Sequence, residues 1–362
     1  MTIGNKFNVL VVGCGHMGTS HAKAYHKLPE FQLVGLVSRS PKSRNALSEL
    51  LGGVPTFENY ELALKITKPH AVSINTYPDT HYGYVKMALK AGAHVFVEKP
   101  LALTVEEAEE LVSLAQKLHK KLVVGYILRV HPAWAQFIAI ARTLGKPLVM
   151  RMNLNQQSSG AQWYTHQQLM RSMSPIVDCG VHYIDVMCLM TGAQPISVSA
   201  IGARLSNEID EKMYNYGQLQ VRFEDGSVGW YEAGWGPMMS ETAFFVKDVI
   251  GPKGCVSIVD EQKGASDDVE GHTKTGGLKI HHSALTENGE FAKKDEVVST
   301  KDEPDHDGLC YLEQVYFLKS ILGDIDLTSH LRDAVNSLKV VLAADASVKT
   351  GKTVFLSRVK AN

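Results

Sequence analysis

The feature that most constrains this chain is a glycine-rich segment close to its start. Gly13-Cys14-Gly15-His16-Met17-Gly18 has the spacing G-x-G-x-x-G and follows the apolar, β-branched run Phe7–Val12. In this spacing the first glycine permits a tight turn, the second lets backbone approach a pyrophosphate, and the third lets the next helix pack closely on the strand. Amides at the helix N-terminus then hold the phosphates. The segment therefore predicts a dinucleotide site.

The first third of the chain alternates short apolar runs with helical patterns. After Phe7–Val12, strands are expected at Phe31–Val37, Ala71–Ile74, His94–Val97 and Leu122–Val124. Short buried strands that alternate with helices indicate βαβ units and a parallel sheet. This alternation stops near Gly125, so residues 1–125 are expected to form an α/β nucleotide-binding domain.

A different pattern follows over residues 126–362. Successive strands are expected at 196–205, 216–223, 227–235 and 244–250, with a turn at Glu224-Asp225-Gly226-Ser227. Neighbouring strands joined by short turns favour a mostly antiparallel sheet, hence an α+β domain. Residues 260–305 are polar and weakly patterned, which suggests irregular hairpins or an exposed insertion. Two helices, 311–322 and 330–348, are expected to pack back on the first domain.

Composition excludes several classes of protein. A length of 362 residues favours two domains, at roughly 100–200 residues each. The formal net charge of -1 gives no general attraction to nucleic acid or anionic lipid. No apolar run reaches the ~20 residues of a membrane span, and none of the five cysteines lies in a C-x-x-C pair. We expect a cytoplasmic protein with no structural metal, membrane or nucleic-acid partner.

The end of the second strand bears on which dinucleotide binds. An acid about 20 residues past the glycine loop ordinarily accepts a hydrogen bond from the ribose 2′-hydroxyl. This chain has Ser38-Arg39-Ser40 there. Without the carboxylate, Arg39 can pair with a 2′-phosphate, and the serines can donate to it. The pattern favours NADP over NAD, although Arg39 could also stack on adenine or be solvated.

Two further segments contain candidate catalytic groups. Lys99 directly follows the strand His94–Val97, where ligands of open α/β sheets bind, although an ordinary surface lysine is the alternative. Asp178 and His182 are four residues apart, so on a helix they share a face, and an aspartate that orients a histidine makes it a competent proton acceptor. The alternative is a helix whose polar residues are solvated or capping. Asp178 and His182 could instead be a pair of metal ligands, but the sequence shows no evident third ligand.

Three histidines follow the glycine loop. His16, His21 and His26 recur every five residues, which scatters them around a helix. We interpret them as ordinary surface or phosphate-proximal residues.

These motifs, in this order, resemble the glucose–fructose oxidoreductase / inositol dehydrogenase / MocA family. The resemblance covers nearly the whole chain and rests on the glycine loop and these further segments: Thr76 with Asp79 and His81, Gly92–Pro100, Gly125-Tyr126, Asp178–His182, Asp333 and Thr350–Val354. It implies a Rossmann domain with a doubly wound parallel sheet, then an α+β domain with a large, mostly antiparallel open sheet. It also implies homodimers or homotetramers that assemble through that sheet.

The resemblance assigns site residues. It implies that Lys99, Asp178 and His182 are catalytic, and that the bond from Lys99 to Pro100 is cis, which would aim the lysine at the nicotinamide. Residues that match cofactor contacts are Gly13, Gly15, His16, Met17, Ser38, Arg39, Asn75, Thr76, His81, Glu98 and Lys99. Arg129 and Trp163 match substrate contacts, and His131 and His166 are weaker candidates. Leu128 and Ser174-Pro175 depart from the pattern and leave the substrate open.

The expected reaction is hydride transfer between a nicotinamide and a carbinol carbon of a sugar, inositol or related cyclic polyol. His182, oriented by Asp178, would take the hydroxyl proton, and Lys99 would stabilise the developing alkoxide. One alternative is a glycosidase-like enzyme that oxidises a sugar transiently with bound NAD. Another is a non-catalytic dinucleotide-binding regulator, against which the presence of Lys99, Asp178 and His182 together argues.

Overall fold

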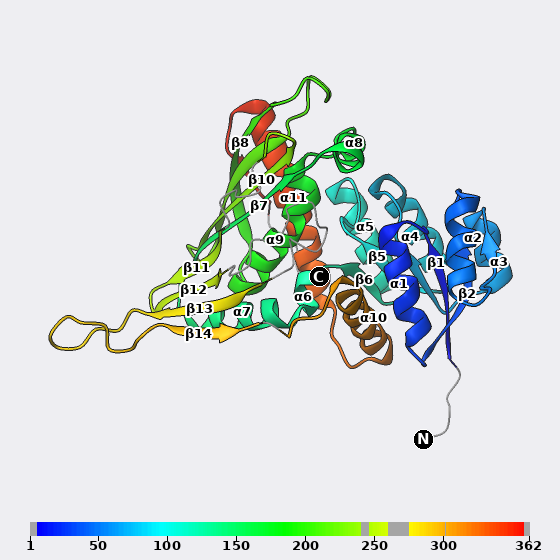
Figure 1. Cartoon of the computed structure of the whole chain (residues 1–362), viewed down its shortest axis with the longest axis horizontal. Coiled ribbons are helices and arrows are strands. Elements are labelled where there is room, and N and C mark those ends of the chain that lie inside the picture. Colours follow the sequence, from blue (N-terminus) through cyan, green and yellow to red (C-terminus); the bar gives the residue numbers. More distant parts are fainter. Residues whose placement is uncertain (1–5, 240–245, 260–274, 301, 358–362) are drawn as a thin grey trace. The chain divides into compact units, whose positions relative to one another are not determined.

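The computed structural model describes residues 6–239, 246–259, 275–300 and 302–357 (Figure 1). By its internal contacts the chain divides into two compact units. The first contains residues 1–130 and 304–335, and the second contains residues 131–303 and 336–362.

The first unit is built on a six-stranded sheet in the order β3-β2-β1-β4-β5-β6. Its strands are β1 (Phe7–Val12), β2 (Phe31–Val37), β3 (Thr56–Phe57), β4 (Ala71–Ile74), β5 (His94–Glu98) and β6 (Leu122–Gly125). Every neighbouring pair is parallel, and the strand order reverses between β1 and β4. The inner strands are almost fully buried because helices cover both faces of such a sheet. The parallel, doubly wound sheet is confirmed.

The helices of the first unit come from both ends of the chain. They are α1 (His16–Lys27), α2 (Pro41–Leu50), α3 (Tyr60–Thr67), α4 (His81–Lys90), α5 (Val105–Lys117), α6 (Ile127–Val130), α10 (His306–Leu322) and a short 3-10 turn, η1 (Pro78–Thr80). Helix α10 packs against α1. The sequence patterns did not predict β3 and α3, because each is short, although Asn59 caps α3 through the amide of Leu62.

A nine-stranded sheet forms the second unit, in the order β14-β13-β12-β11-β7-β10-β9-β8-β15. The strands are β7 (Val149–Gln157), β8 (Pro195–Ala203), β9 (Tyr216–Phe223), β10 (Val228–Gly236), β11 (Lys247–Gly251), β12 (Gly254–Val259), β13 (Gly277–His282), β14 (Glu296–Ser299) and β15 (Val354–Phe355). Among the described strands, only β7 and β10 pair in parallel, so the mostly antiparallel sheet is confirmed.

Part of the weakly patterned region lies outside the described residues. Residues 260–274 and 301 are not described, nor is the start of the strand expected at 244–250. The described remainder, 275–300, forms the antiparallel pair β13 and β14. Residues 283–295 between these strands are exposed turns and bends with one isolated bridge, so the described part is a hairpin with a short regular ladder and an irregular tip.

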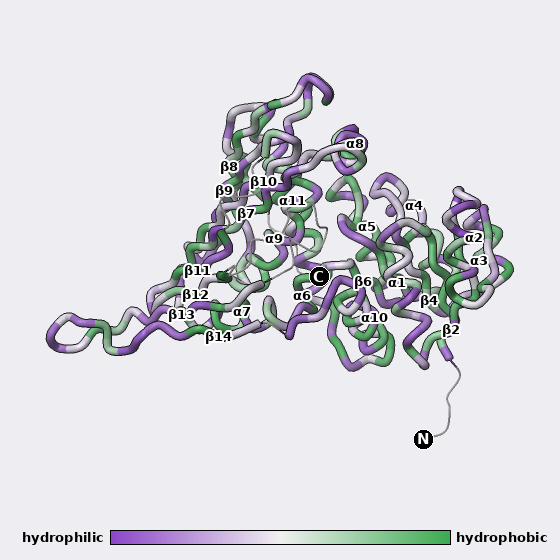
Figure 2. Tube along the Cα trace, viewed as in Figure 1, coloured by the Kyte–Doolittle hydropathy of each residue, from purple (hydrophilic) through white to green (hydrophobic). Residues whose placement is uncertain are grey.

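The described helices that belong to the second unit, wholly or in part, are α7 (Pro132–Thr143), α8 (Gly160–Leu169), α9 (Pro175–Thr191) and α11 (Thr328–Thr350). Helix α9 is buried along almost its whole length and packs on β9 and β10. Buried and exposed residues alternate along β9, so this sheet has a covered and an uncovered face, and Figure 2 shows both hydrophobic and hydrophilic residues along its strands. The sequence patterns did not predict helix α8, because no apolar stripe runs along it.

Within the described residues, every helix is too short or too polar to span a lipid bilayer.

Candidate nucleotide and catalytic sites

The turn between β1 and α1 needs its glycines for different reasons. Gly13 has φ +94°, and a Cβ there would lie 2.3 Å from the carbonyl oxygen of Asn75. A Cβ on Gly18 would lie 1.9 Å from the carbonyl oxygen of Gly13, so this glycine lets α1 pack on the turn. A Cβ on Gly15 meets nothing within 4 Å, which leaves space beside the backbone for a ligand.

The N-terminus of α1 is suited to an anion. Gly15 is the N-cap residue and has no side chain to bond the first amides, and no acidic side chain lies in the first turn. The amides of the first turn, including those of His16 and Met17, therefore keep their donors for a ligand, and the helix dipole favours negative charge there. The residues present fit a dinucleotide pyrophosphate.

The other predicted cofactor residues follow the carboxyl ends of neighbouring strands. Ser38 and Arg39 follow β2, Asn75 and Thr76 follow β4, and Lys99 follows β5. Because these strands are parallel, all of these residues lie along one edge of the sheet, beside the point where the strand order reverses. The structure thus brings the predicted cofactor residues of the first unit to the edge where open α/β sheets bind nucleotides.

An arginine that the sequence patterns did not single out supports the turn after β2. Arg44 donates hydrogen bonds to the carbonyl oxygens of Ser38 at 2.8 Å and of Arg39 at 3.2 Å. Ser40 caps α2 by accepting from the amide of Ser43 at 3.3 Å. The side chain of Arg39 is itself exposed. The serine and arginine expected to choose between NAD and NADP are therefore held on a defined turn.

His81, a predicted cofactor residue, lies between two loops of the site. Its side chain is fully buried, and its ring nitrogens lie 2.7 Å from the carbonyl oxygen of Pro100 and 3.0 Å from that of Thr76. Burial lowers the pKa of His81, so the ring is neutral and donates to one carbonyl at a time. His81 ties two loops of the site together, and its role as a cofactor contact stays a prediction.

The segment Glu98-Lys99-Pro100 is anchored from inside the unit. The bond from Lys99 to Pro100 is cis, as the resemblance implied. Oε1 of Glu98 lies 2.7 Å from Nε2 of His21, and Oε2 accepts from the amide of Lys99 at 3.3 Å. The ring of His21 is fully buried. The interpretation of His21 as a surface or phosphate-proximal residue is therefore wrong: the interface of α1 with α10 encloses it.

Arg129, a predicted substrate contact, lies in a buried ion pair. Its guanidinium is 3.0 Å from a carboxylate oxygen of Asp333, and the two side chains are 8% and 2% exposed. Arg332 bonds the other oxygen of Asp333 at 2.9 Å. This arrangement gives Arg129 a structural partner on α11, and a substrate role stays a prediction.

In the second unit, α9 carries the predicted catalytic pair. Ser174 caps the helix through the amide of Val177 at 3.2 Å and donates to Asp345 at 2.7 Å, and Pro175 occupies the first helical position. This explains the departure from the family pattern at Ser174-Pro175 as a capped helix start. Asp178 and His182 follow one turn apart on this helix, and His182 is 6% exposed.

Gly180, between Asp178 and His182, lets α9 approach its neighbours. A Cβ on Gly180 would lie 3.1 Å from Val341 and 3.2 Å from the ring of Tyr231. Both distances are tighter than ordinary contacts, so with a larger residue at this position the two neighbouring side chains would have to shift slightly. The Asp-x-Gly-x-His spacing thus combines a packing requirement with the two polar groups.

The remaining candidate substrate residues of the second unit lie on α8 and at the start of α7. The ring of His166 stacks on Trp235 at 4.4 Å, and burial lowers its pKa to about 4 although the charge of Asp178 opposes this shift. The indole N–H of Trp163 donates to Glu208, and Trp163 is 8% exposed. His131 caps α7 through the amide of Ala133, which is a structural role.

The fold and these residues define a class: an oxidoreductase with an NAD-binding Rossmann fold. Residues 7–126 match the family described as "Oxidoreductase family, NAD-binding Rossmann fold", and residues 136–256 match the "GFO/IDH/MocA C-terminal domain". The chain belongs to the GFO/IDH/MocA family.

Two curated relatives and one solved structure illustrate this membership. UDP-N-acetylglucosamine 3-dehydrogenase of Acidithiobacillus ferrooxidans is 32% identical over 53% of this chain, which spans just over half (56%) of that relative. The scyllo-inositol 2-dehydrogenase (NAD(+)) of Bacillus subtilis is 28% identical over 68% of this chain and 72% of that relative. An NAD binding oxidoreductase from Klebsiella pneumoniae shares the fold with a TM-score of 0.79, at 18% identity over 98% of this chain and 100% of that one.

Two alanine substitutions separate the roles of the loop glycines. Gly15→Ala is expected to keep the melting temperature and to weaken NAD binding, because the added methyl occupies the space beside the phosphate-binding backbone. Gly18→Ala forces a methyl against the Gly13 carbonyl and should destabilise the fold by about 1–3 kcal/mol. Thermal unfolding and NAD titration check both. Undiminished NAD binding by Gly15→Ala would contradict the assignment of this loop.

Proposed function

We propose that this chain is an NAD(P)-dependent dehydrogenase or reductase that acts on a CH–OH carbon of a sugar, inositol or related cyclic polyol. The observation that carries this proposal is the combination of the glycine loop of this family with Lys99 at the end of β5 and the Asp178/His182 pair on one helix. The names of the two curated relatives, both dehydrogenases of sugar-like rings, support the substrate class.

The proposed roles of the residues follow from their chemistry. Bound nicotinamide supplies the hydride acceptor. His182 accepts the hydroxyl proton, and Asp178 orients its ring and stabilises the charge that forms. The ammonium of Lys99 donates a hydrogen bond to the oxygen on which negative charge develops. In the reductive direction the same groups return the proton. Trp163 and Arg129 remain proposed substrate contacts.

A preference for NADP is part of the proposal. Position 38 holds serine where a carboxylate would accept from the 2′-hydroxyl of NAD. Arg39 is exposed beside it, and Arg44 holds the backbone of both residues. A guanidinium and serine hydroxyls suit a 2′-phosphate, because they donate charge-assisted hydrogen bonds to it.

Arg39→Ala tests this preference. The variant should bind NADP about 10- to 100-fold more weakly, since a hydrogen bond to a charged group contributes about 1.5–3 kcal/mol, and should bind NAD nearly as the native chain does. Dissociation constants measured from protein fluorescence would show the difference. Lys117→Ala, which removes an exposed charge at the end of α5, is the control. An equal loss for both dinucleotides contradicts the 2′-phosphate argument.

A substrate screen tests the function as a whole. Polyols and aldoses are offered with NAD and with NADP, and formation of free reduced cofactor is followed by absorbance. Reduction with at least one polyol or aldose is expected. Cleavage of glycosides with no net cofactor reduction would point instead to the glycosidase-like alternative, and dinucleotide binding with no turnover would point to the regulator.

We also propose a homodimer or homotetramer in the cytoplasm. The uncovered face of the second sheet exposes the large apolar residues Val149, Val228 and Ile250, which a second copy would cover. All five cysteines are free thiols, which suits a reducing compartment. Sedimentation of the purified chain would measure the oligomeric state.

A further inference from the structure

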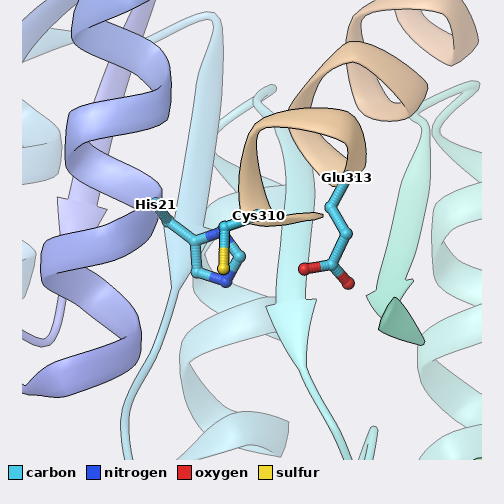
Figure 3. Close-up of side chains that lie close together, drawn as sticks. All are labelled: His21, Cys310 and Glu313. Atoms are coloured by element: carbon cyan, nitrogen blue, oxygen red, sulfur yellow. The ribbon is translucent and has the colours of Figure 1, made fainter. Parts of the chain in front are cut away.

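A buried set of polar side chains lies behind Lys99, on α1 and α10. Figure 3 shows His21 on α1, with the side chains of Cys310 and Glu313 extending toward it from α10. All three residues are buried, and one ligand atom from each lies within 4.8 Å of the others. The catalytic proposal above does not use these groups, so their arrangement requires its own explanation.

A bound metal does not fit the hydrogen bonds of His21. A metal needs the lone pair of a ring nitrogen. Nε2 of His21 is 2.7 Å from Oε1 of Glu98, and Nδ1 is 2.8 Å from Nε2 of Gln314. Both nitrogens are thus engaged, and the geometry favours a hydrogen-bonded chain over a metal centre.

The donors and acceptors along this path of hydrogen bonds follow from the chemistry of the Gln314 side chain. The amide Nε2 of Gln314 can only donate, so Nδ1 of His21 accepts and the ring proton sits on Nε2. That proton is donated to Oε1 of Glu98. The second oxygen of Glu98 accepts from the backbone amide of Lys99 at 3.3 Å. A continuous path of hydrogen bonds therefore runs from α10 through α1 to the backbone of Lys99.

The side chains that form this path of hydrogen bonds are buried. His21 and Gln314 are fully buried, and the ring of Phe96 packs against that of His21 with 4.8 Å between centroids. Glu98 is 8% exposed. Burial acts to raise the pKa of Glu98, but the hydrogen bond from His21 and the charge of Lys99 outweigh it and keep that pKa below its usual value. The carboxylate is therefore ionised and can hold two donors at once.

We propose that His21 and Gln314 are positioning residues for Lys99: through the carboxylate of Glu98 they fix the backbone from which the Lys99 side chain extends. This inference rests on the proposed catalytic role of Lys99. Without the His21 donor, a buried Glu98 keeps only one of its two hydrogen bonds and can take up a proton or turn away. The amide of Lys99 then loses its acceptor, and the ammonium loses its alignment.

The first readout needs neither cofactor nor substrate. Amide hydrogen exchange of the whole protein reports how firmly the amide of Lys99 is held. His21→Leu removes the donor to Glu98 and should speed exchange at Lys99, whereas His21→Gln keeps an amide donor in reach of Oε1 and should restore protection. Cys310 belongs to the same buried cluster but makes none of the hydrogen bonds of this path. Cys310→Ala should therefore leave exchange at Lys99 unchanged.

The second readout is turnover with the polyol or aldose found in the screen. His21→Leu should lower kcat about 10- to 100-fold, because misplacement of a catalytic group by about 1 Å costs that much, and should leave the NAD dissociation constant nearly unchanged. Gln314→Leu should lower kcat in the same direction, by less. In a Lys99→Met background, His21→Leu should cause no further loss, since its effect passes through Lys99.

The outcomes separate two failures. If the native chain turns over no polyol or aldose, the proposed function is wrong. If Lys99→Met retains turnover, the catalytic role of Lys99, on which this inference rests, is wrong. If Lys99→Met loses turnover but His21→Leu does not, or if His21→Leu and His21→Gln lose it equally together with melting temperature, the positioning role is wrong. If His21→Leu does not fold, Gln314→Leu tests the same role, and unchanged turnover by that variant would contradict it.

Discussion

Lys99→Met and His182→Asn are each expected to lower turnover about 10²–10⁴-fold, the usual contribution of one general acid–base group. The dissociation constant for the dinucleotide should change far less than turnover, because the glycine loop that would hold the pyrophosphate stays intact. Stopped-flow measurement of cofactor reduction, together with a fluorescence titration of NAD, would separate the two quantities. The loss should fall mainly on kcat, since these groups act on charge that develops in the transition state.

Matched controls keep this result specific. Lys90→Met at the end of α4 and His26→Asn in the last turn of α1 replace exposed residues of the same types. Both should turn over as the native chain does. Full turnover by both Lys99→Met and His182→Asn would remove them from the mechanism.

Glu313→Gln is expected to make the fold more stable relative to the native chain as the pH rises. Both carboxyl oxygens of Glu313 are buried with no hydrogen-bond partner in the described part of the chain. Burial and the nearby charge of Glu98 hold the pKa of Glu313 well above its ordinary value of 4.5. The folded chain therefore keeps a proton on Glu313 that the unfolded chain releases above that value.

The sign of the effect follows from proton release on unfolding. Between pH 4.5 and the raised pKa of folded Glu313, unfolding releases one proton. The free energy of unfolding therefore falls by about 1.4 kcal/mol per pH unit from this group. Glutamine carries no such proton, so the difference between variant and native chain should grow at that rate. The groups that face Glu313 are His21 and Cys310 and, across a small cavity, Arg129 and His330; they are the same in variant and native chain.

Urea unfolding from pH 5 to pH 8 would measure this difference. Glu287→Gln, at an exposed position, is the control and should show no pH-dependent difference from the native chain. A constant difference between Glu313→Gln and the native chain over that range contradicts a protonated Glu313.

Sequence patterns predicted the elements that depend on local chemistry. The apolar run before Gly13 predicts β1, and the glycine spacing predicts the turn into α1, because the positive φ of Gly13 and the contact of Gly18 with Gly13 are local constraints. The four-residue spacing of Asp178 and His182 places both on one face of α9. Where local signals were short or polar, as in β3 and α8, the prediction missed the element because no hydrophobic period marks it.

The surroundings of individual side chains depended on contacts distant in sequence. Nothing near His21 shows that Gln314, 293 positions later, donates to its ring. Likewise, the ion pair of Arg129 with Asp333 joins residues 204 positions apart. Burial of both groups is a property of the packed unit, and burial decides whether a polar side chain is solvated or tied to a partner.

The sequence by itself determined the family, the parallel and antiparallel sheets and the residues placed at the strand ends, because periodicity and motif spacing are local properties of the chain. Only the tertiary structure decided that His81 joins two loops, that Arg129 is paired inside the first unit, and that Glu98 is held from α10 through His21. Those outcomes depend on which helices pack together, since a polar group buried in low-dielectric surroundings is costly unless a partner lies beside it.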